Sequence, residues 1–205
     1  MLAAMCIALA LAGCRGSIAG GSGPNDAGKT LAIVGARIYT SPTEAPITDG
    51  AVVMTDGSIA AVGRRGQVRV PANASVLDGA GLTVTAGFWN AHVHFTEEKF
   101  QSAGSRPAAD LAAALRAMLT RWGVINAVDT GSWLENTLAL RGRIESGEVP
   151  GPRIMIASGT FVPVGGSPYY VLPARLPELA NPERATALVE RLLEDPGVDA
   201  VKLFT

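Results

Sequence analysis

The chain has few of the residues that mark several common classes of protein. It holds two cysteines in 205 residues, Cys6 and Cys14, both close to the N-terminus, which excludes a fold built on a framework of disulfides. Aromatic residues make up only 5% of the chain, which argues against a base-stacking platform, and a net charge of −1 gives no basic surface for nucleic acid. We therefore expect no nucleic-acid partner.

The balance of apolar and charged residues is that of a packed globular protein. Apolar residues make up 48% of the chain and charged residues 17%, which does not fit a disordered chain. A length of 205 residues allows one ordinary domain, or one small domain together with part of a larger one.

The N-terminus has the pattern of an export signal. Leu2 to Ala12 is unbroken small or apolar sequence, too short to span a bilayer as a mature helix. It runs into Leu11-Ala12-Gly13-Cys14, which resembles the lipobox of bacterial lipoproteins, where the signal is cut before the cysteine and the cysteine is lipidated. This resemblance implies a signal peptide over residues 1–14, lipid on Cys14, and an exported, membrane-anchored lipoprotein of a bacterium. The alternative is a plain secretory signal with an incidental cysteine.

Residues 15–85 are expected to form a tether and then a small β module. Residues 15–29 are rich in Gly, Ser and Asn, which predicts a flexible tether. Short runs rich in Val, Ile and Ala then predict strands, and Asp56-Gly57 between two of them predicts a hairpin. The expected strands are Leu31–Tyr39, Ala51–Thr55, Ser58–Val62, Ser75–Leu77 and Leu82–Thr85.

From Phe88 onward the pattern alternates between strand and helix. Such repeated units with apolar strands predict an α/β fold, a parallel sheet covered by helices. A barrel and an open doubly wound sheet both fit, although no Gly-x-Gly-x-x-Gly follows the first strand, which disfavours the dinucleotide-binding version. The expected strands are Phe88–His94, Val124–Val128, Ile154–Ala157 and Ala200–Phe204, and the expected helices are Pro107–Trp122, Leu134–Ile144 and Asn181 to about Glu194.

The only two histidines of the chain, His92 and His94, lie two residues apart at the end of the first of these strands. Residues i and i+2 of a strand project to the same face, so the two imidazoles can converge on one metal ion. By itself the pattern also fits two ordinary histidines on one side of a strand.

The wider context resembles the amidohydrolase superfamily, most closely its imidazolonepropionase-like and prolidase-like members. The resemblance covers about Leu31 to Thr205 and implies a (β/α)8 TIM-type barrel preceded by part of a small β-sandwich. The usual Pro-Gly before the first barrel strand is Ala86-Gly87 in this chain. The segments that resemble the family in order and spacing are Ile47–Val53, Asp56–Gly63, Leu77–Gly81 and Ala86–His94.

The resemblance assigns His92 and His94 as metal ligands at the C-terminal end of barrel strand one, where barrel active sites lie. It implies hydrolysis of C–N bonds in non-peptide amides, cyclic amides or dipeptides through a metal-activated water. Zinc suits imidazole ligands, in a site of one or two ions, although manganese, iron, nickel and cobalt also bind such sites.

Lys202 is the third candidate metal ligand. Strand alternation in Val201-Lys202-Leu203-Phe204 points its side chain into the barrel, where an unpaired ammonium would be costly. In many relatives the lysine at the end of strand four is carboxylated and bridges two metal ions, and Lys202 matches that position. The alternatives are a barrel lysine in a salt bridge and a lysine that is simply exposed.

Two further features could contribute to a pocket. Asp129 and Thr130 end the second strand, where they could line a pocket, although an aspartate there also commonly caps the following helix. The stretch from Gly159 to Ala180, with Gly165-Gly166 and Tyr169-Tyr170, is long for a βα loop and could contact a substrate.

The family's two further histidines and its proton-shuttling aspartate have no counterpart in this sequence, so no catalytic acid or base is assigned. We expect residues 30–85 to be a partial β-sandwich and 86–205 the N-terminal half of the barrel, its first four βα units. Three hypotheses follow: an amidohydrolase by descent that is inactive alone, a non-catalytic lipoprotein that binds metal or a small ligand, and half of a split enzyme. The third requires self-association or a complementing C-terminal chain.

Overall fold

The computed structural model describes residues 29–171, 173 and 175–204. The predicted signal peptide, the lipidation site at Cys14 and all of the predicted tether except Lys29 lie outside the described residues. Among the described residues, no helix is both long enough and apolar enough to span a bilayer.

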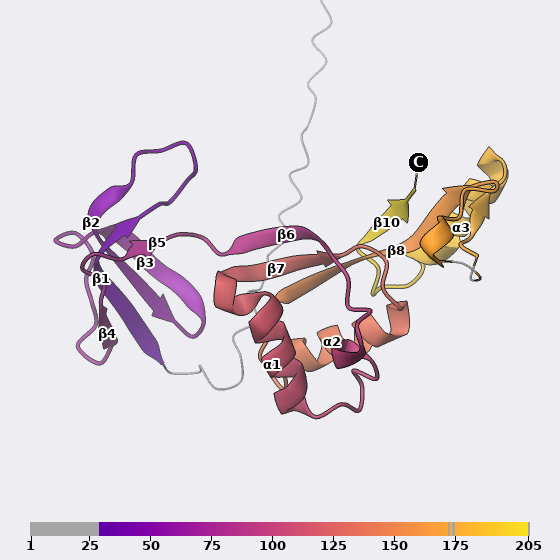
Figure 1. The fold of residues 1–205 in the computed structure, drawn as a ribbon. Helices are drawn as coiled ribbons and strands as arrows, with labels where there is room; N and C mark the ends of the chain where they lie inside the picture. Colours follow the sequence, from indigo (N-terminus) through magenta and orange to yellow (C-terminus); the bar gives the residue numbers. More distant parts are fainter. Residues whose placement is uncertain (1–28, 172, 174, 205) are drawn as a thin grey trace, which may run out of the picture.

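The first part of the described chain is a single five-stranded sheet (Figure 1). Its order is β3-β2-β1-β4, with the short β5 also pairing with β1, antiparallel between β1, β2 and β3 and parallel elsewhere. The second sheet of a sandwich is not found among residues 30–85, so the predicted partial sandwich is seen as one layer only. The strands are β1 (Thr30–Ile38), β2 (Ile47–Thr55), β3 (Ser58–Arg64), β4 (Ser75–Asp78) and β5 (Thr83–Val84).

The predicted hairpin between β2 and β3 is confirmed. Asp56 and Gly57 both have positive φ angles, 51° and 75°, as a two-residue turn of type I′ requires. This turn matches the twist of its strands, and β2 and β3 pair from Thr55 and Ser58 outward.

The second part is a parallel sheet with helices, as the alternating pattern predicts. Its order, β10-β8-β7-β6, follows the chain without the reversal that marks a doubly wound sheet. Three strand–helix units are followed by a fourth strand, which agrees with the four strands and three helices expected from the sequence. The strands are β6 (Phe88–Val93), β7 (Val124–Asp129), β8 (Arg153–Pro163) and β10 (Ala200–Leu203), with β9 (Glu178–Leu179) beside the end of β8.

The helices of this part begin and end close to the predicted positions. The helix α3 (Pro182–Leu193) starts as predicted, because Asn181 Oδ1 accepts a hydrogen bond from Arg184 N at 2.8 Å and Pro182 follows it. The expected helix Pro107–Trp122 is instead divided into α1 (Ala108–Met118) and a 3₁₀ turn, η2 (Thr120–Trp122). The other helix is α2 (Leu134–Glu145), and two more 3₁₀ turns are η1 (Glu98–Phe100) and η3 (Tyr169–Val171).

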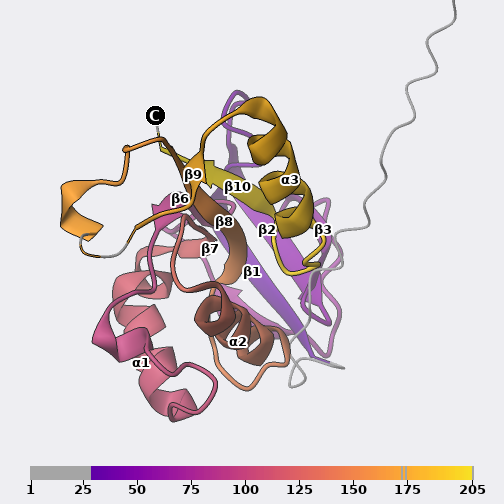
Figure 2. The same ribbon diagram turned by 90° about the vertical axis from the view of Figure 1, so that its right-hand side faces the viewer.

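The helices α1 and α2 lie on one side of the parallel sheet, as Figures 1 and 2 show from two directions. The apolar core of this part lies between these helices and strands β6, β7 and β8. Burial of this core leaves the opposite face of β6 exposed, which is where the two histidines lie. The buried core residues are Val93, Phe95, Phe100, Ala103, Leu111, Leu115, Leu119, Ala127, Leu140, Val149, Ile154 and Ile156.

The third parallel strand is longer than predicted. The sequence suggested that it ends at Ala157, but β8 continues to Pro163 through Gly159 and Thr160, whose φ angles are 95° and 41°. After this irregular stretch the side chains of Phe161 and Val162 are buried. Their burial favours extension of the strand. The expected loop from Gly159 is therefore shorter and includes the 3₁₀ turn η3 and strand β9.

Candidate metal centre and pocket

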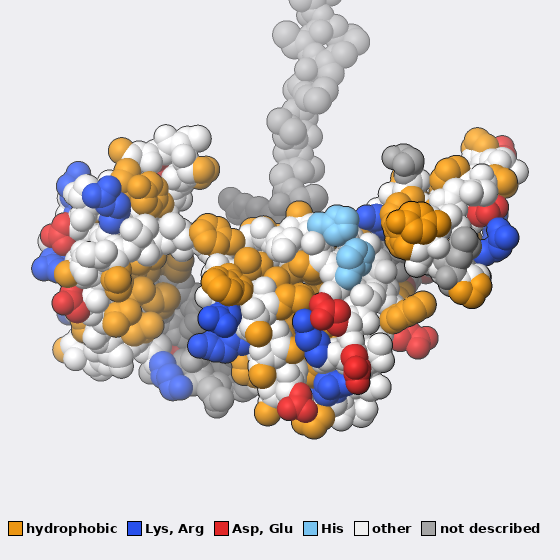
Figure 3. All heavy atoms as spheres, viewed as in Figure 1, with side chains coloured by type: hydrophobic (Ala, Val, Ile, Leu, Met, Phe, Trp, Pro, Cys, Tyr) orange, Lys and Arg blue, Asp and Glu red, His pale blue; other side chains and the backbone are white. Residues whose placement is uncertain are grey.

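The two histidines occupy the face of β6 that points away from the helices. Val93 and Phe95 alternate with them and are buried in the core, so His92 and His94 are directed to the opposite, exposed side. Their Nε2 atoms are 3.2 Å apart and their ring centroids 5.2 Å apart. Figure 3 shows the two imidazoles side by side at the molecular surface.

This geometry fits two ligands of one metal ion. Two nitrogens bound to a tetrahedral zinc ion at about 2.0–2.1 Å lie about 3.3 Å from each other. The observed separation of 3.2 Å is close to this value, and it also fits a hydrogen bond in which one Nε2 donates and the other accepts. Among the described residues, no group of three or more His, Cys, Asp or Glu side chains is placed to hold a metal.

Lys202 lies on β10 and is half-buried. Its Nζ atom is 5.0 Å from the centre of the Phe204 ring, and its charge acts on His94. Within the described part of the chain Lys202 forms no ion pair, so the salt-bridge alternative finds no partner there. Its role as a metal ligand stays a prediction.

Several groups act on the pKa of His94. Partial burial lowers the pKa below the ordinary value of 6.5, Asp129 opposes this, and the charges of His92 and Lys202 lower the pKa further. The neutral imidazole is therefore favoured near neutral pH. A neutral imidazole is the form that binds a metal ion.

Asp129 has neither of the two roles expected from the sequence, pocket lining and helix capping. It is buried, does not line the pocket and does not cap α2, whose N-cap residue is Trp133. Its Oδ1 atom accepts hydrogen bonds from Ser132 N at 3.1 Å and Ser132 Oγ at 2.7 Å, and its Oδ2 atom accepts one from Thr137 Oγ1 at 2.7 Å. Three polar partners compensate the carboxylate for burial.

Sequence reasoning did not identify Ser132 and Thr137. The only available signal was the Asp-x-x-Ser spacing, because short polar side chains often bond to backbone groups three residues away. Thr130, which the sequence did suggest, lines the pocket and also donates a backbone hydrogen bond to Val93 O at 3.0 Å.

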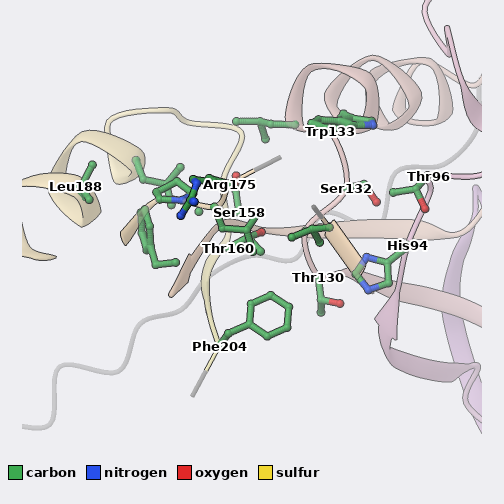
Figure 4. A pocket seen from close by; sticks show the side chains of 18 of the residues that line it. His94, Thr96, Thr130, Ser132, Trp133, Ser158, Thr160, Arg175, Leu188 and Phe204 are labelled. Carbon is green, nitrogen blue, oxygen red and sulfur yellow. The ribbon is translucent and has the colours of Figure 1, made fainter. Parts of the chain in front are cut away.

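A pocket of about 1010 Å³ begins at His94. It extends past Thr130 to the segment after β8 and to α3, and Figure 4 shows Ser158 and Thr160 between the His94 end and the Arg175 end. Such a volume accommodates a small organic molecule. Apolar and aromatic side chains form much of its wall, including Trp133, Phe161, Tyr170, Leu188, Leu192 and Phe204.

The predicted contribution of the segment after β8 is found in part. Tyr170 lines the pocket, whereas Tyr169, Gly165 and Gly166 do not. Arg175 and Leu176, which sequence reasoning did not single out, also line it.

No family model matches the chain, and no curated protein matches it. Solved structures do resemble its fold. A protein from Bifidobacterium longum assigned as a prolidase is 27% identical, with a TM-score of 0.64 over 85% of this chain and 40% of that protein. Molinate hydrolase is 25% identical, with a TM-score of 0.67 over 86% of this chain and 45% of that enzyme.

A Xaa-Pro dipeptidase with methionine bound in its active site is 20% identical, with a TM-score of 0.65 over 85% of this chain and 47% of that enzyme. At this identity the likeness concerns the fold alone. The chain thus has a mixed α/β fold similar to that of prolidases and amidohydrolases, and spans 40% to 47% of the length of these three proteins.

Proposed function

We propose that the chain is part of a metal-dependent amidohydrolase that hydrolyses a C–N bond in a small amide, cyclic amide or dipeptide. One observation carries the proposal: two histidines at the C-terminal end of a parallel strand hold their Nε2 atoms 3.2 Å apart, and one of them, His94, lines a pocket of about 1010 Å³. The fold likeness to a prolidase and to molinate hydrolase supports the same reaction class.

His92 and His94 would hold the metal, for which zinc is the first candidate because imidazole nitrogens suit it. When bound, such an ion lowers the pKa of a water molecule to about 7 and polarises a carbonyl group. The chain's own contribution is to present the His94 imidazole in neutral form, which its lowered pKa favours. The pocket wall would orient the substrate beside them.

Lys202 would be the third ligand after its neutral amine adds carbon dioxide and releases one proton to give a carbamate, since a protonated ammonium has no lone pair to donate to a metal. Its half-buried position and its electrostatic effect on His94 support a place beside the histidines. In this proposal the barrel is incomplete within this sequence, and residues outside it complete the ligand set and supply the catalytic acid and base.

The proposal is tested by hydrolysis of an amide, cyclic amide and Xaa-Pro dipeptide panel with zinc present. We expect the purified chain to bind metal but to show no turnover until a polypeptide carrying the missing half of the barrel is added. Turnover that appears with the second chain and is lost in His92→Ala supports the split or incomplete enzyme. Metal binding without turnover under all conditions would instead favour the non-catalytic lipoprotein.

Export and membrane anchoring through lipid on Cys14 are a separate part of the proposal, supported by the Leu11–Cys14 sequence. Expression in a bacterium should place the chain in the membrane fraction, and Cys14→Ser should release it to the soluble exported fraction. Recovery of both the unaltered chain and Cys14→Ser in the soluble exported fraction would favour a plain secretory signal.

A further inference from the structure

The backbone that follows His94 is fixed by a side chain from a distant part of the sequence. Ser132 Oγ accepts a hydrogen bond from Phe95 N at 2.7 Å, across 37 positions of the chain. Phe95 itself is fully buried and packs edge-to-face against Phe100, with ring centroids 5.2 Å apart. The peptide unit that joins His94 to Phe95 is thus held both by a hydrogen bond and by core packing.

Asp129 orients the Ser132 hydroxyl that accepts this hydrogen bond. As a carboxylate Asp129 can only accept hydrogen bonds, so Ser132 Oγ must donate its one proton to Asp129 Oδ1, 2.7 Å away. The hydroxyl lone pairs are then left to accept the Phe95 N–H. Thr137 Oγ1 donates to the second carboxylate oxygen and holds the carboxylate in this orientation.

The backbone that precedes His94 is held by Thr130, from the same segment after β7 as Ser132. Thr130 N donates to Val93 O at 3.0 Å, so residues on both sides of His94 are tied to the segment after β7. His94 itself makes no hydrogen bond to this segment among the described residues. Among hydrogen bonds, the orientation of its ring therefore depends on those of its flanking backbone and on the contact with His92.

We propose that Ser132, held by Asp129, is a positioning residue that fixes the direction of the His94 imidazole for metal binding. This inference goes one step beyond the proposed metal site and rests on it. The ligating nitrogen is at the far end of the ring, so a small rotation of the backbone at Phe95 moves Nε2 out of its 3.2 Å relation with His92. Groups that orient a metal ligand typically change metal affinity about 10- to 100-fold when removed.

The test uses the full chain with Ser132→Ala, Ser132→Thr and Asn136→Ala. Asn136 on α2 is the control, because it holds another loop, through Ala103 N and Phe100 O, and makes no hydrogen bond to the His94–Phe95 peptide. Binding of Co²⁺ should weaken about tenfold in Ser132→Ala, return to within about twofold in Ser132→Thr, and stay unchanged in Asn136→Ala.

A second measurement works without metal. Since the chain has only two histidines, two Cε1–H signals report their rings in a carbon–proton NMR spectrum, and His92→Gln assigns them. Ser132→Ala should shift or broaden the His94 signal, and Asn136→Ala should not. If Ser132→Ala and Asn136→Ala behave alike in this spectrum, the positioning role is wrong. If the unaltered chain fails to bind Co²⁺ while the His94 signal responds as expected, the proposed metal site fails and the brace on His94 stands.

Discussion

Gly131 and the side chain of Thr160 meet so closely beside the pocket that a Cβ atom on Gly131 would lie 2.6 Å from Thr160 Oγ1. Gly131 also has a φ of 117°, which L side chains rarely adopt. Thr160 itself has a φ of 41°, an uncommon value for a β-branched residue. Two residues with positive φ, Gly131 after β7 and Thr160 within β8, thus meet at this edge of the pocket.

The first prediction concerns this contact. Gly131→Ala should lower the free energy of unfolding by about 1–3 kcal/mol, because the backbone there is unfavourable for alanine and the new methyl group meets Thr160. Gly142→Ala is the control, since Gly142 lies in α2 with open space around it and should gain about 0.5–1 kcal/mol. Urea unfolding followed by circular dichroism measures both, and effects of the same sign would contradict the described backbone.

The second prediction concerns the core between α2 and the parallel sheet. Leu140 is fully buried there, so Leu140→Ala should cost about 2–5 kcal/mol of unfolding free energy through lost burial and a residual cavity. Leu193→Ala on α3 is the control, because Leu193 is 55% exposed and its truncation should change stability by less than about 1 kcal/mol. Equal losses for the two variants would show that α2 does not pack as described.

The third prediction concerns the charge of Lys202. Because Lys202 lowers the pKa of His94, Lys202→Met should raise that pKa toward the ordinary value. Arg121→Met is a matched control, since Arg121 is another cation above an aromatic ring, Trp122, and does not act on His94. An NMR titration of the histidine Cε1–H signals gives both values. A His94 pKa that does not move in Lys202→Met would place Lys202 away from the histidines.

The fourth prediction concerns stability against pH in the metal-free chain. The pKa of His94 is lower in the folded state than its ordinary 6.5, so below about pH 6.5 the unfolded chain binds the proton more readily. The unfolding free energy should therefore fall as pH drops from about 6.5 through the folded pKa, and this loss should be absent in His94→Gln. Unfolding curves of both proteins at several pH values between about 7.5 and 5 provide the comparison. Equal losses of stability in the two proteins would contradict the prediction.

Features set by neighbouring residues could be predicted from the sequence. The turn at Asp56-Gly57 and the start of α3 at Asn181-Pro182 depend on local backbone preferences, and both are found in place. The shared direction of His92 and His94 also follows from local geometry, because alternate residues of a strand face the same side.

Features set by contacts between distant residues could not be predicted in this way. The extension of β8 beyond Gly159 depends on burial of Phe161 and on its pairing with Leu203, about forty residues later. The link from Ser132 to Phe95 joins a loop to a strand end 37 positions away. The sequence suggested that Asp129 lines a pocket or caps a helix. It could not reveal that Thr137, on the following helix α2, donates a hydrogen bond to the Asp129 carboxylate.

The central claim is that His92 and His94 together hold a metal ion. The most direct measurement is the amount of zinc bound per chain after dialysis against a fixed low concentration of zinc, for the unaltered chain, His92→Ala and His94→Ala. The account predicts at least one zinc ion per unaltered chain and its loss in each variant, with secondary structure retained in all three. Zinc binding that survives in either variant, or its absence from the unaltered chain, would contradict the account.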